Sequence, residues 1–299
     1  SSSYSNPVFN YFREEELFNL TNLLKPLSEE TEIAVLKDNN LEVIRTNPEF
    51  QTNKDHNRPT NRLCTALLSR DRLAFILRYA LVYVAEPGGI QKHIMRYPQL
   101  FATKAIERKL NAGVKKGIIW HTQGSGKTAL AYYNVRFLTD YFQNQQVIPK
   151  FYFIVDRLDL LQQAQREFTA RGLIVHLIDS REAFTRDIKA TQALHKAEIT
   201  VVNIQKFRDD PDVVTTKDYD INIQRVYFLD EVHRSYNPKG SFLANLSQSD
   251  TNAIKIGLTG TPLLGTDYNS RDLFGDYIHK YYYNASIADG YTLRLIREE

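Results

Sequence analysis

The sequence contains a single cysteine, Cys64. One cysteine cannot form a disulfide within the chain, so a disulfide-stabilised framework is excluded and a reducing, cytoplasmic location is expected. No apolar run approaches the roughly eighteen residues that a membrane-spanning helix needs. Residues 1–7 have neither the charge nor the apolar centre of a signal peptide. These absences favour a globular protein without a membrane segment, and its 42% hydrophobic content is ample for a buried core.

The sequence also lacks a strong excess of charge of one sign, since its formal net charge is only +3. The distribution is nevertheless uneven. From Arg96 to Arg136, eight basic residues stand against one acid, Glu107, which gives this window +7 and leaves −4 for the remainder. A local positive field suits phosphate, whether of a nucleotide or of DNA. For each of these basic residues except Lys127, the alternative interpretation is a position on a solvated helix face.

The first 88 residues are expected to form a mainly helical connecting region. Residues 14–18 open one expected helix, and residues 70–84 form a second. Between them, residues 47–62 are rich in Asn, Thr and Pro, which predicts a loop or an excursion over another domain. The Glu-Pro-Gly-Gly segment 86–89 breaks the chain. We therefore expect a domain boundary between 1–88 and 89–299.

The second region, residues 89–299, is expected to form an α/β domain. After a helical segment around 100–110, short apolar runs alternate with stretches of helical periodicity, which is typical of a parallel sheet covered by helices on both faces. The runs lie at residues 117–120, 151–155, 173–178, 199–204, 225–229 and 254–258. Two intervening helices carry an apolar stripe, formed by Ala131, Val135, Leu138 and Phe142 in one and by Leu161, Ala164 and Phe168 in the other. In such a sheet, ligands bind outside the carboxyl ends of the strands.

A glycine-rich segment follows the first apolar run directly, because residues 121–128 read His-Thr-Gln-Gly-Ser-Gly-Lys-Thr. Glycines here let backbone N–H groups close around phosphate at the start of a helix, where the helix dipole also favours negative charge. We expect backbone donors from Gly124, Ser125 and Gly126. Lys127 is expected to bridge the outer phosphates, and the Thr128 hydroxyl to bind magnesium. An ordinary turn between a strand and a helix is the alternative.

Two adjacent carboxylates, Asp230 and Glu231, follow the apolar run at 225–229. Asp230 is expected to hold magnesium, and Glu231 to position and activate the hydrolytic water, which is the division of labour that phosphoryl transfer requires. On its own, an acidic pair at a strand end is more often a helix N-cap. Together with the phosphate loop, however, the pair predicts an ATP-hydrolysing motor with ATP and Mg²⁺ as cofactors.

Five segments resemble, in order and context, the R subunit of type I restriction enzymes, a helicase-like motor of superfamily 2. They are residues 121–128, 154–160, 201–207, 230–235 and 258–262. The resemblance covers roughly residues 90–299 and accommodates His121, since superfamily 2 proteins tolerate residues other than glycine at that position. It implies a RecA-like parallel sheet and ATP-driven translocation of double-stranded DNA before endonucleolytic cleavage. It also implies a type I site-specific deoxyribonuclease whose methylation and specificity subunits are partners of this chain.

The same resemblance implies roles for residues outside the phosphate loop and the acidic pair. Gln99, in the segment 96–99, is similar to a glutamine that reads the adenine base. His233 and the motif Thr259, Gly260 and Thr261 are similar to residues that couple the nucleotide to the nucleic-acid surface. Residues 286–293 resemble the segment that leads into the family's second motor domain.

Two parts of the family pattern are missing: the Glu-x-Lys triad of the nuclease, and the second RecA-like domain with its arginine finger. The chain is therefore expected to be a fragment that hydrolyses ATP weakly by itself and cuts no DNA. The alternative is the motor domain of another superfamily 2 helicase, of the DEAH type, acting on DNA or RNA. A switch GTPase is disfavoured because no Asn-Lys-x-Asp follows the loop. A relict nucleotide site in an interaction module is disfavoured because Lys127 and Glu231 are both retained.

Overall fold

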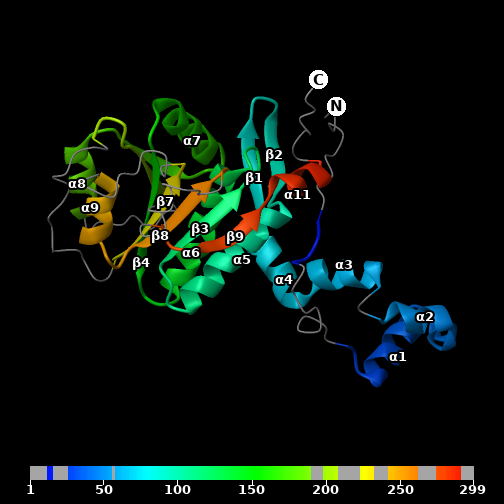
Figure 1. Ribbon diagram of the computed structural model, residues 1–299. Helices are drawn as coiled ribbons and strands as arrows, with labels where there is room; N and C mark the ends of the chain where they lie inside the picture. Colours follow the sequence, from blue (N-terminus) through cyan, green and yellow to red (C-terminus); the bar gives the residue numbers. More distant parts are fainter. Residues whose placement is uncertain are drawn as a thin grey trace. The chain divides into compact units, whose positions relative to one another are not determined.

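The computed structural model describes residues 12–15, 26–55, 58–189, 198–207, 223–231, 242–261 and 274–290. By its internal contacts the chain divides into two compact units, Ser1–Leu81 and Val82–Glu299. Figure 1 shows the elements of both units along the chain. The functional boundary expected after residue 88 stays a prediction.

The first unit is mainly helical, as expected. Its elements are α1 (Glu29–Asp38), η2 (Glu42–Thr46), α2 (Pro48–Asn53), α3 (Pro59–Leu68), α4 (Arg70–Phe75) and η3 (Ile76–Ala80). A buried ion pair between Arg72 Nη1 and Glu14 Oε2, 3.1 Å apart, joins α4 to the start of the described chain. The helix expected to open at Glu14 is wrong for Glu14 and Glu15, which have no regular secondary structure, and residues 16–18 lie outside the described residues.

Two further predictions for this part of the chain are wrong. The expected loop at 47–62 contains α2 and the start of α3, and each helix has proline at its first position, where the fixed φ of proline suits a helix start. The helix expected over 70–84 ends at Ala80. Strand β1 (Leu81–Glu86) follows it, because Val82 and Val84 are buried while Tyr83 is 67% exposed, a period of two. Strand β1 pairs with β2 (Gly89–Ile94).

Within the described residues of the second unit, seven parallel strands form one sheet in the order β5-β6-β4-β7-β8-β3-β9. The strands are β3 (Lys116–His121), β4 (Ile148–Val155), β5 (Ile174–Ile178), β6 (Glu198–Asn203), β7 (Ile223–Asp230), β8 (Ile254–Thr259) and β9 (Tyr277–Tyr281). All six predicted strands are confirmed. Strand β9 was not predicted, because its sequence Tyr-Ile-His-Lys-Tyr contains no apolar run.

Helices cover both faces of this sheet, as Figure 1 shows. They are α5 (Tyr97–Asn111), α6 (Lys127–Gln143), α7 (Leu158–Ala170), α8 (Arg181–Lys189) and α9 (Phe242–Ser249), and α11 (Tyr283–Ala288) follows β9. Successive side chains of β4 point to opposite faces. The Tyr152 ring packs against Phe184 of α8, with centroids 5.5 Å apart, and the Phe153 ring packs against Phe168 of α7 at 5.2 Å. The predicted fold class, an α/β domain with a parallel sheet covered by helices on both faces, is confirmed.

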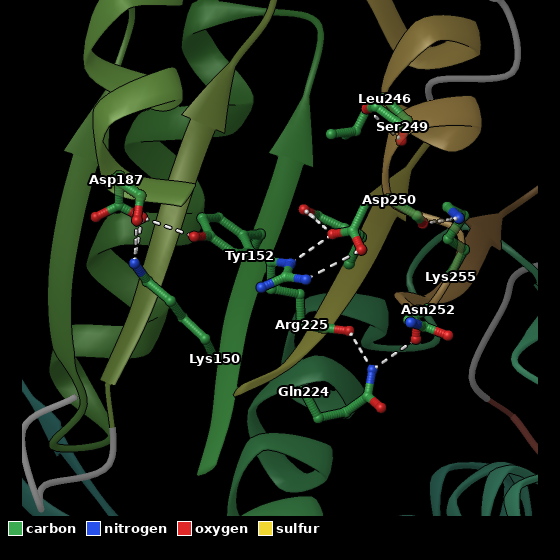
Figure 2. A network of polar contacts seen from close by, with 11 residues as sticks. Lys150, Tyr152, Asp187, Gln224, Arg225, Leu246, Ser249, Asp250, Asn252 and Lys255 are labelled. Carbon is green, nitrogen blue, oxygen red and sulfur yellow. Dashed lines mark hydrogen bonds and ion pairs between the residues drawn. The ribbon is translucent and has the colours of Figure 1, made fainter. Parts of the chain in front are cut away.

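A network of buried polar side chains lies near the amino end of β7 (Figure 2). The carboxylate of Asp250, directly after α9, accepts hydrogen bonds from Arg225 Nε at 2.5 Å and from the Tyr227 hydroxyl at 3.0 Å. Arg225 and Asp250 are 2% and 1% exposed. The ammonium of Lys255 donates to the Asp250 carbonyl oxygen at 2.9 Å. Strands β7 and β8 are thus tied to the carboxyl end of α9 by a buried ion pair and by hydrogen bonds.

Candidate nucleotide-binding site

The segment between β3 and α6 has the backbone geometry of a phosphate-binding loop. Gly124 and Gly126 both have φ of +82°, in the left-handed region that glycine adopts without strain. Gly126 is the N-cap residue of α6, which begins at Lys127. The loop therefore presents backbone N–H groups at a helix N-terminus, where the helix dipole favours an anion. Ser125 is buried in this loop.

A cavity of about 460 Å³ opens at the carboxyl ends of the strands, where the sequence predicted the site. The loop and first turn of α6 line it with Gly124, Gly126, Lys127 and Thr128, and β7 contributes Asp230 and Glu231. The opposite wall comes from α7, including Gln163 and Glu167. The two sequence motifs, about a hundred residues apart along the chain, thus meet at one cavity.

Glu231 is held in place from three directions. Its Oε1 accepts a hydrogen bond from the Gly260 N–H at 2.6 Å and lies 3.3 Å from Lys127 Nζ. The Thr259 hydroxyl lies 3.2 Å from its Oε2. The Glu231 backbone has φ of +54°, a left-handed conformation that costs energy for a residue with a side chain. This strained backbone turns the carboxylate toward the lysine and the β8 terminus.

Gly260 occupies a position where a side chain would crowd this arrangement. A Cβ at Gly260 would lie 3.1 Å from Glu231 Oε1 and 3.3 Å from Lys127 Nζ. Next to it, the Thr261 N–H donates to the Thr259 hydroxyl oxygen at 3.1 Å. Thr259 and Gly260 therefore contact Glu231 directly, and Thr261 contacts Thr259, while His233 lies outside the described residues.

Asp230 is a buried carboxyl with one oxygen unsatisfied. It is 7% exposed, and its Oδ1 has no hydrogen-bond partner among the residues that the structure describes. Burial raises the pKa of Asp230 to about 7, against the positive charge of Lys127, and the neighbouring carboxylates Glu231, Asp156 and Glu167 raise it further. A cation beside Asp230 would offset this cost.

The residues present fit a magnesium ion better than a metal held entirely by protein. In the described ranges, no group of three or more His, Cys, Asp or Glu side chains could hold a metal. Mg²⁺ is usually bound by one or two protein oxygens together with substrate phosphates and water. The unsatisfied oxygen of Asp230 and the hydroxyl residue Thr128, which line the same cavity, match that requirement.

Gln99 lies behind the phosphate loop. Its Oε1 accepts from the Arg96 N–H at 2.9 Å, and its Nε2 donates to the Gly126 carbonyl at 2.9 Å. A Cβ at Gly126 would lie 2.6 Å from this Nε2, so the contact requires glycine. Gln99 is 4% exposed and supports the loop. Its role in reading adenine stays a prediction.

His121 occupies the place of the first glycine in the commonest phosphate-loop motif, and its side chain joins the loop to β9. The side chain is fully buried, and its Nε2 lies 2.8 Å from Nδ1 of His279 on β9. Burial lowers the pKa of both rings, that of His279 to about 4. One neutral ring therefore donates to the other. His279 is not among the residues singled out from the sequence, because the segment 277–281 has no apolar pattern that predicts a strand.

Comparison with known proteins agrees with this geometry. The SWI2/SNF2 ATPase family matches residues 98–299, about two thirds of the chain. The chain is 26% identical to the endonuclease subunit of type I restriction enzyme SauCOLORF180P from Staphylococcus aureus (strain COL), over 96% of this chain and 31% of the relative. It is 27% identical to the endonuclease subunit of type I restriction enzyme HindI from Haemophilus influenzae, over 79% of this chain and 24% of the relative.

A solved structure, the ATP-dependent Type ISP restriction-modification enzyme LlaBIII bound to DNA, aligns with a TM-score of 0.49 and 12% identity, covering 68% of this chain and 16% of that chain. The resemblance to type I restriction subunits that the motifs predicted is confirmed by the curated relatives. The chain spans about a third of the length of the first of these relatives. Since the family match includes the phosphate loop, the acidic pair and the β8 terminus, the chain belongs to the SWI2/SNF2 ATPase family.

Proposed function

We propose that this chain is the first motor domain of a type I restriction R subunit, which couples ATP hydrolysis to translocation of double-stranded DNA before cleavage. The observation that carries the proposal is the contact of Glu231 with both Lys127 and Gly260 at one cavity. Glu231, which would act on the nucleotide, thus contacts the motif of Thr259, Gly260 and Thr261, which would transmit the state of the nucleotide to the DNA-binding surface. The names of the curated relatives support the type of enzyme.

Each residue of the site can be given a role in ATP binding or hydrolysis that suits its chemistry. Lys127 binds the outer phosphates of ATP by a charge-assisted contact, and these phosphates compete with Glu231 for its ammonium group. Glu231 then orients the attacking water and holds the proton that this water loses on a carboxylate oxygen. Gly124, Ser125 and Gly126 contribute backbone N–H groups to the phosphates. Asp230 and Thr128 would hold Mg²⁺, which supplies positive charge against the phosphates.

Coupling to DNA would follow from the hydrogen bonds around Glu231. A change in the position of its carboxylate alters its bond with the Gly260 N–H and its contact with the Thr259 hydroxyl. The Thr259 hydroxyl in turn contacts the backbone of Thr261. We expect this turn, together with His233, to pass the state of the nucleotide to the DNA-binding surface.

The proposed partners are double-stranded DNA, the methylation and specificity subunits, and the second motor and nuclease domains of the same subunit. An arginine finger contributes roughly 10³–10⁵ in rate to phosphoryl transfer, and we expect it to come from the second motor domain. This chain alone should therefore hydrolyse ATP weakly and cut no DNA. Among the described residues no helix is both long and apolar enough to cross a membrane, and a cytoplasmic location stays a prediction.

The test combines three assays on the purified chain and on its Lys127→Ala variant. We expect a fluorescent ATP analogue to bind the wild type in the presence of Mg²⁺ and not the variant. We expect slow ATP turnover that responds to duplex DNA more than to RNA, and no nicking of supercoiled plasmid. A response to RNA alone would favour a DEAH-type helicase, and failure to bind the analogue would refute the nucleotide site itself.

A further inference from the structure

The chain that leaves the sheet after β9 is tied to the first turn of α5 by one carboxylate. Asp289, directly after α11, accepts a hydrogen bond on Oδ2 from the Tyr281 hydroxyl at 2.6 Å. The same oxygen accepts a hydrogen bond from the Tyr97 hydroxyl. The two tyrosine rings meet edge to face, with centroids 5.7 Å apart. Asp289 thus joins the end of β9 to the start of α5.

The turn of α5 that Asp289 contacts is also the turn that supports the phosphate loop. Gln99, two residues after Tyr97, donates to the Gly126 carbonyl, and Arg96 Nη1 lies 3.3 Å from the Gly124 carbonyl. These bonds reach the two glycines whose left-handed backbone shapes the loop. A displacement of this turn would therefore move the N–H groups that face phosphate.

The loop is held from its other end by β9. The Thr122 N–H, at the start of the loop, donates to the Tyr281 carbonyl at 3.2 Å. The buried contact between His121 and His279 lies beside it, and the His121 ring also packs edge to face against Tyr281. Tyr281 consequently touches the loop through its backbone and Asp289 through its hydroxyl. Both supports of the phosphate loop meet at this one carboxylate.

We propose that Asp289 is a positioning residue for the phosphate loop, which it aligns through Tyr97 on one side and Tyr281 on the other. This inference rests on the proposed nucleotide-binding function. It implies that the segment following β9 sets the nucleotide affinity of the site without touching the nucleotide.

The only tryptophan of the chain, Trp120, reports on this arrangement. It is the residue before His121 on β3, and its ring packs against Tyr282 with centroids 4.6 Å apart and against Tyr277 at 5.7 Å. A shift between β3 and the segment after β9 changes the surroundings of this indole. Its fluorescence therefore reports a shift between β3 and the segment after β9 independently of ATPase activity.

The experiment measures affinity for a fluorescent ATP analogue and the change in Trp120 emission when Mg-ATP is added. Asp289→Ala should weaken affinity by about tenfold, in the lower part of the range seen for coupling between sites, and should suppress the emission change. Asp289→Asn should retain most of the affinity and most of the emission change, because the amide oxygen of asparagine can still accept hydrogen bonds from the two tyrosines. Asp187→Ala is the matched control, since Asp187 also accepts from a tyrosine, Tyr152, but lies near the start of β4.

An unchanged affinity and emission response in Asp289→Ala would overturn the inference. So would an equal loss in Asp187→Ala, because that result would indicate general loosening of the fold. Far-ultraviolet circular dichroism and thermal melting, run on every variant, identify any protein that fails to fold. If Asp289→Ala does not fold, Tyr97→Phe and Tyr281→Phe, which each remove one hydroxyl, must reduce affinity in its place, and intact affinity in both overturns the inference. A wild type that binds no ATP refutes the proposed function and this inference together, whereas intact wild-type binding isolates the role of Asp289.

Discussion

Strand β7 connects two buried carboxyl groups that have opposite surroundings. Near its amino end, Asp250 is 1% exposed and is paired with Arg225 and the Tyr227 hydroxyl (Figure 2). At its carboxyl end, Asp230 is 7% exposed and its Oδ1 has no partner in the described part of the chain. Burial raises the pKa of Asp230 to about 7. Near its amino end the strand thus binds the carboxylate of Asp250 through Arg225 and Tyr227, and at its carboxyl end it carries Asp230, which has an oxygen available to a ligand.

The difference indicates how structural and functional charges can be distinguished in this protein. In a buried ion pair each charge compensates the other, and removing one partner leaves an uncompensated charge. A buried carboxyl with a raised pKa in a cavity is instead typical of a functional site. One end of the sheet therefore serves as the control for substitutions at the other.

The largest effect is expected when Lys127 is replaced, and Lys150, which forms an ion pair at the opposite end of the sheet, provides the control. The side chains of Lys127 and Lys150 are both 12% exposed, and they pair with Glu231 and Asp187. Lys127→Ala should abolish binding of a fluorescent ATP analogue, because the charge-assisted contact to phosphate is lost, while Lys150→Ala should bind normally. Glu231→Gln should retain binding yet lose about 10²–10⁴ in turnover, since general-base assistance acts in the transition state. Equal loss of affinity in Lys127→Ala and Glu231→Gln would contradict these roles.

The second prediction concerns stability. Arg225→Met should lower the free energy of unfolding by about 3–5 kcal/mol, because it leaves the Asp250 carboxylate buried without its guanidinium partner. Asp230→Asn should cause no such loss, because it replaces a buried carboxyl with a neutral group of the same size. Urea unfolding monitored by circular dichroism measures both. A loss in Asp230→Asn as large as in Arg225→Met would mean that Asp230 is also structural.

A smaller effect should appear when pH is changed. Burial, with Arg108 adding positive charge, lowers the pKa of His279 from 6.5 to about 4, and burial, His279 and Lys127 lower that of His121. The unfolded chain then takes up protons that the folded protein excludes. Stability is therefore present above pH 6.5 and decreases as the pH falls toward 4. For His279 alone the loss between pH 7 and pH 5 is about 2 kcal/mol.

The variant to compare with the wild type is His279→Gln. It removes one of the two titrating rings and leaves a group that can hydrogen-bond to His121. Urea midpoints measured at pH 7 and pH 5 should differ less in this variant than in the wild type. An identical difference in both proteins would show that the histidine pair does not control acid sensitivity.

The smallest effect is expected at Gln99. Its amide already bonds to Arg96 and Gly126, so reading a base would exchange hydrogen bonds rather than add them. Gln99→Ala should therefore reduce the preference for ATP over GTP by only about 1 kcal/mol, the typical net value of one hydrogen bond. Gln163→Ala is the matched control, because Gln163 lines the cavity from α7. A lower melting temperature with unchanged discrimination would make Gln99 purely structural.

Prediction from the sequence succeeded where a pattern is local. Each of the six apolar runs forms a strand, and the stripes on α6 and α7 are buried. It failed where neighbours in space decide the outcome. Residues 81–84 continue an apolar helical pattern, yet they form β1 and pair with β2. Strand β9 has no apolar signature and exists because β3 offers an edge to which it can pair.

The sequence by itself determined which groups are available for the proposed phosphate site: the glycines, Lys127 and the acidic pair, because backbone freedom and charge at fixed spacing are local properties. Only the tertiary structure decided how these groups are held. The contact of Glu231 with Gly260, the bond from Gln99 to Gly126 and the pairing of His121 with His279 each join elements distant in the chain. Such contacts depend on strand order and burial, which sequence spacing does not encode.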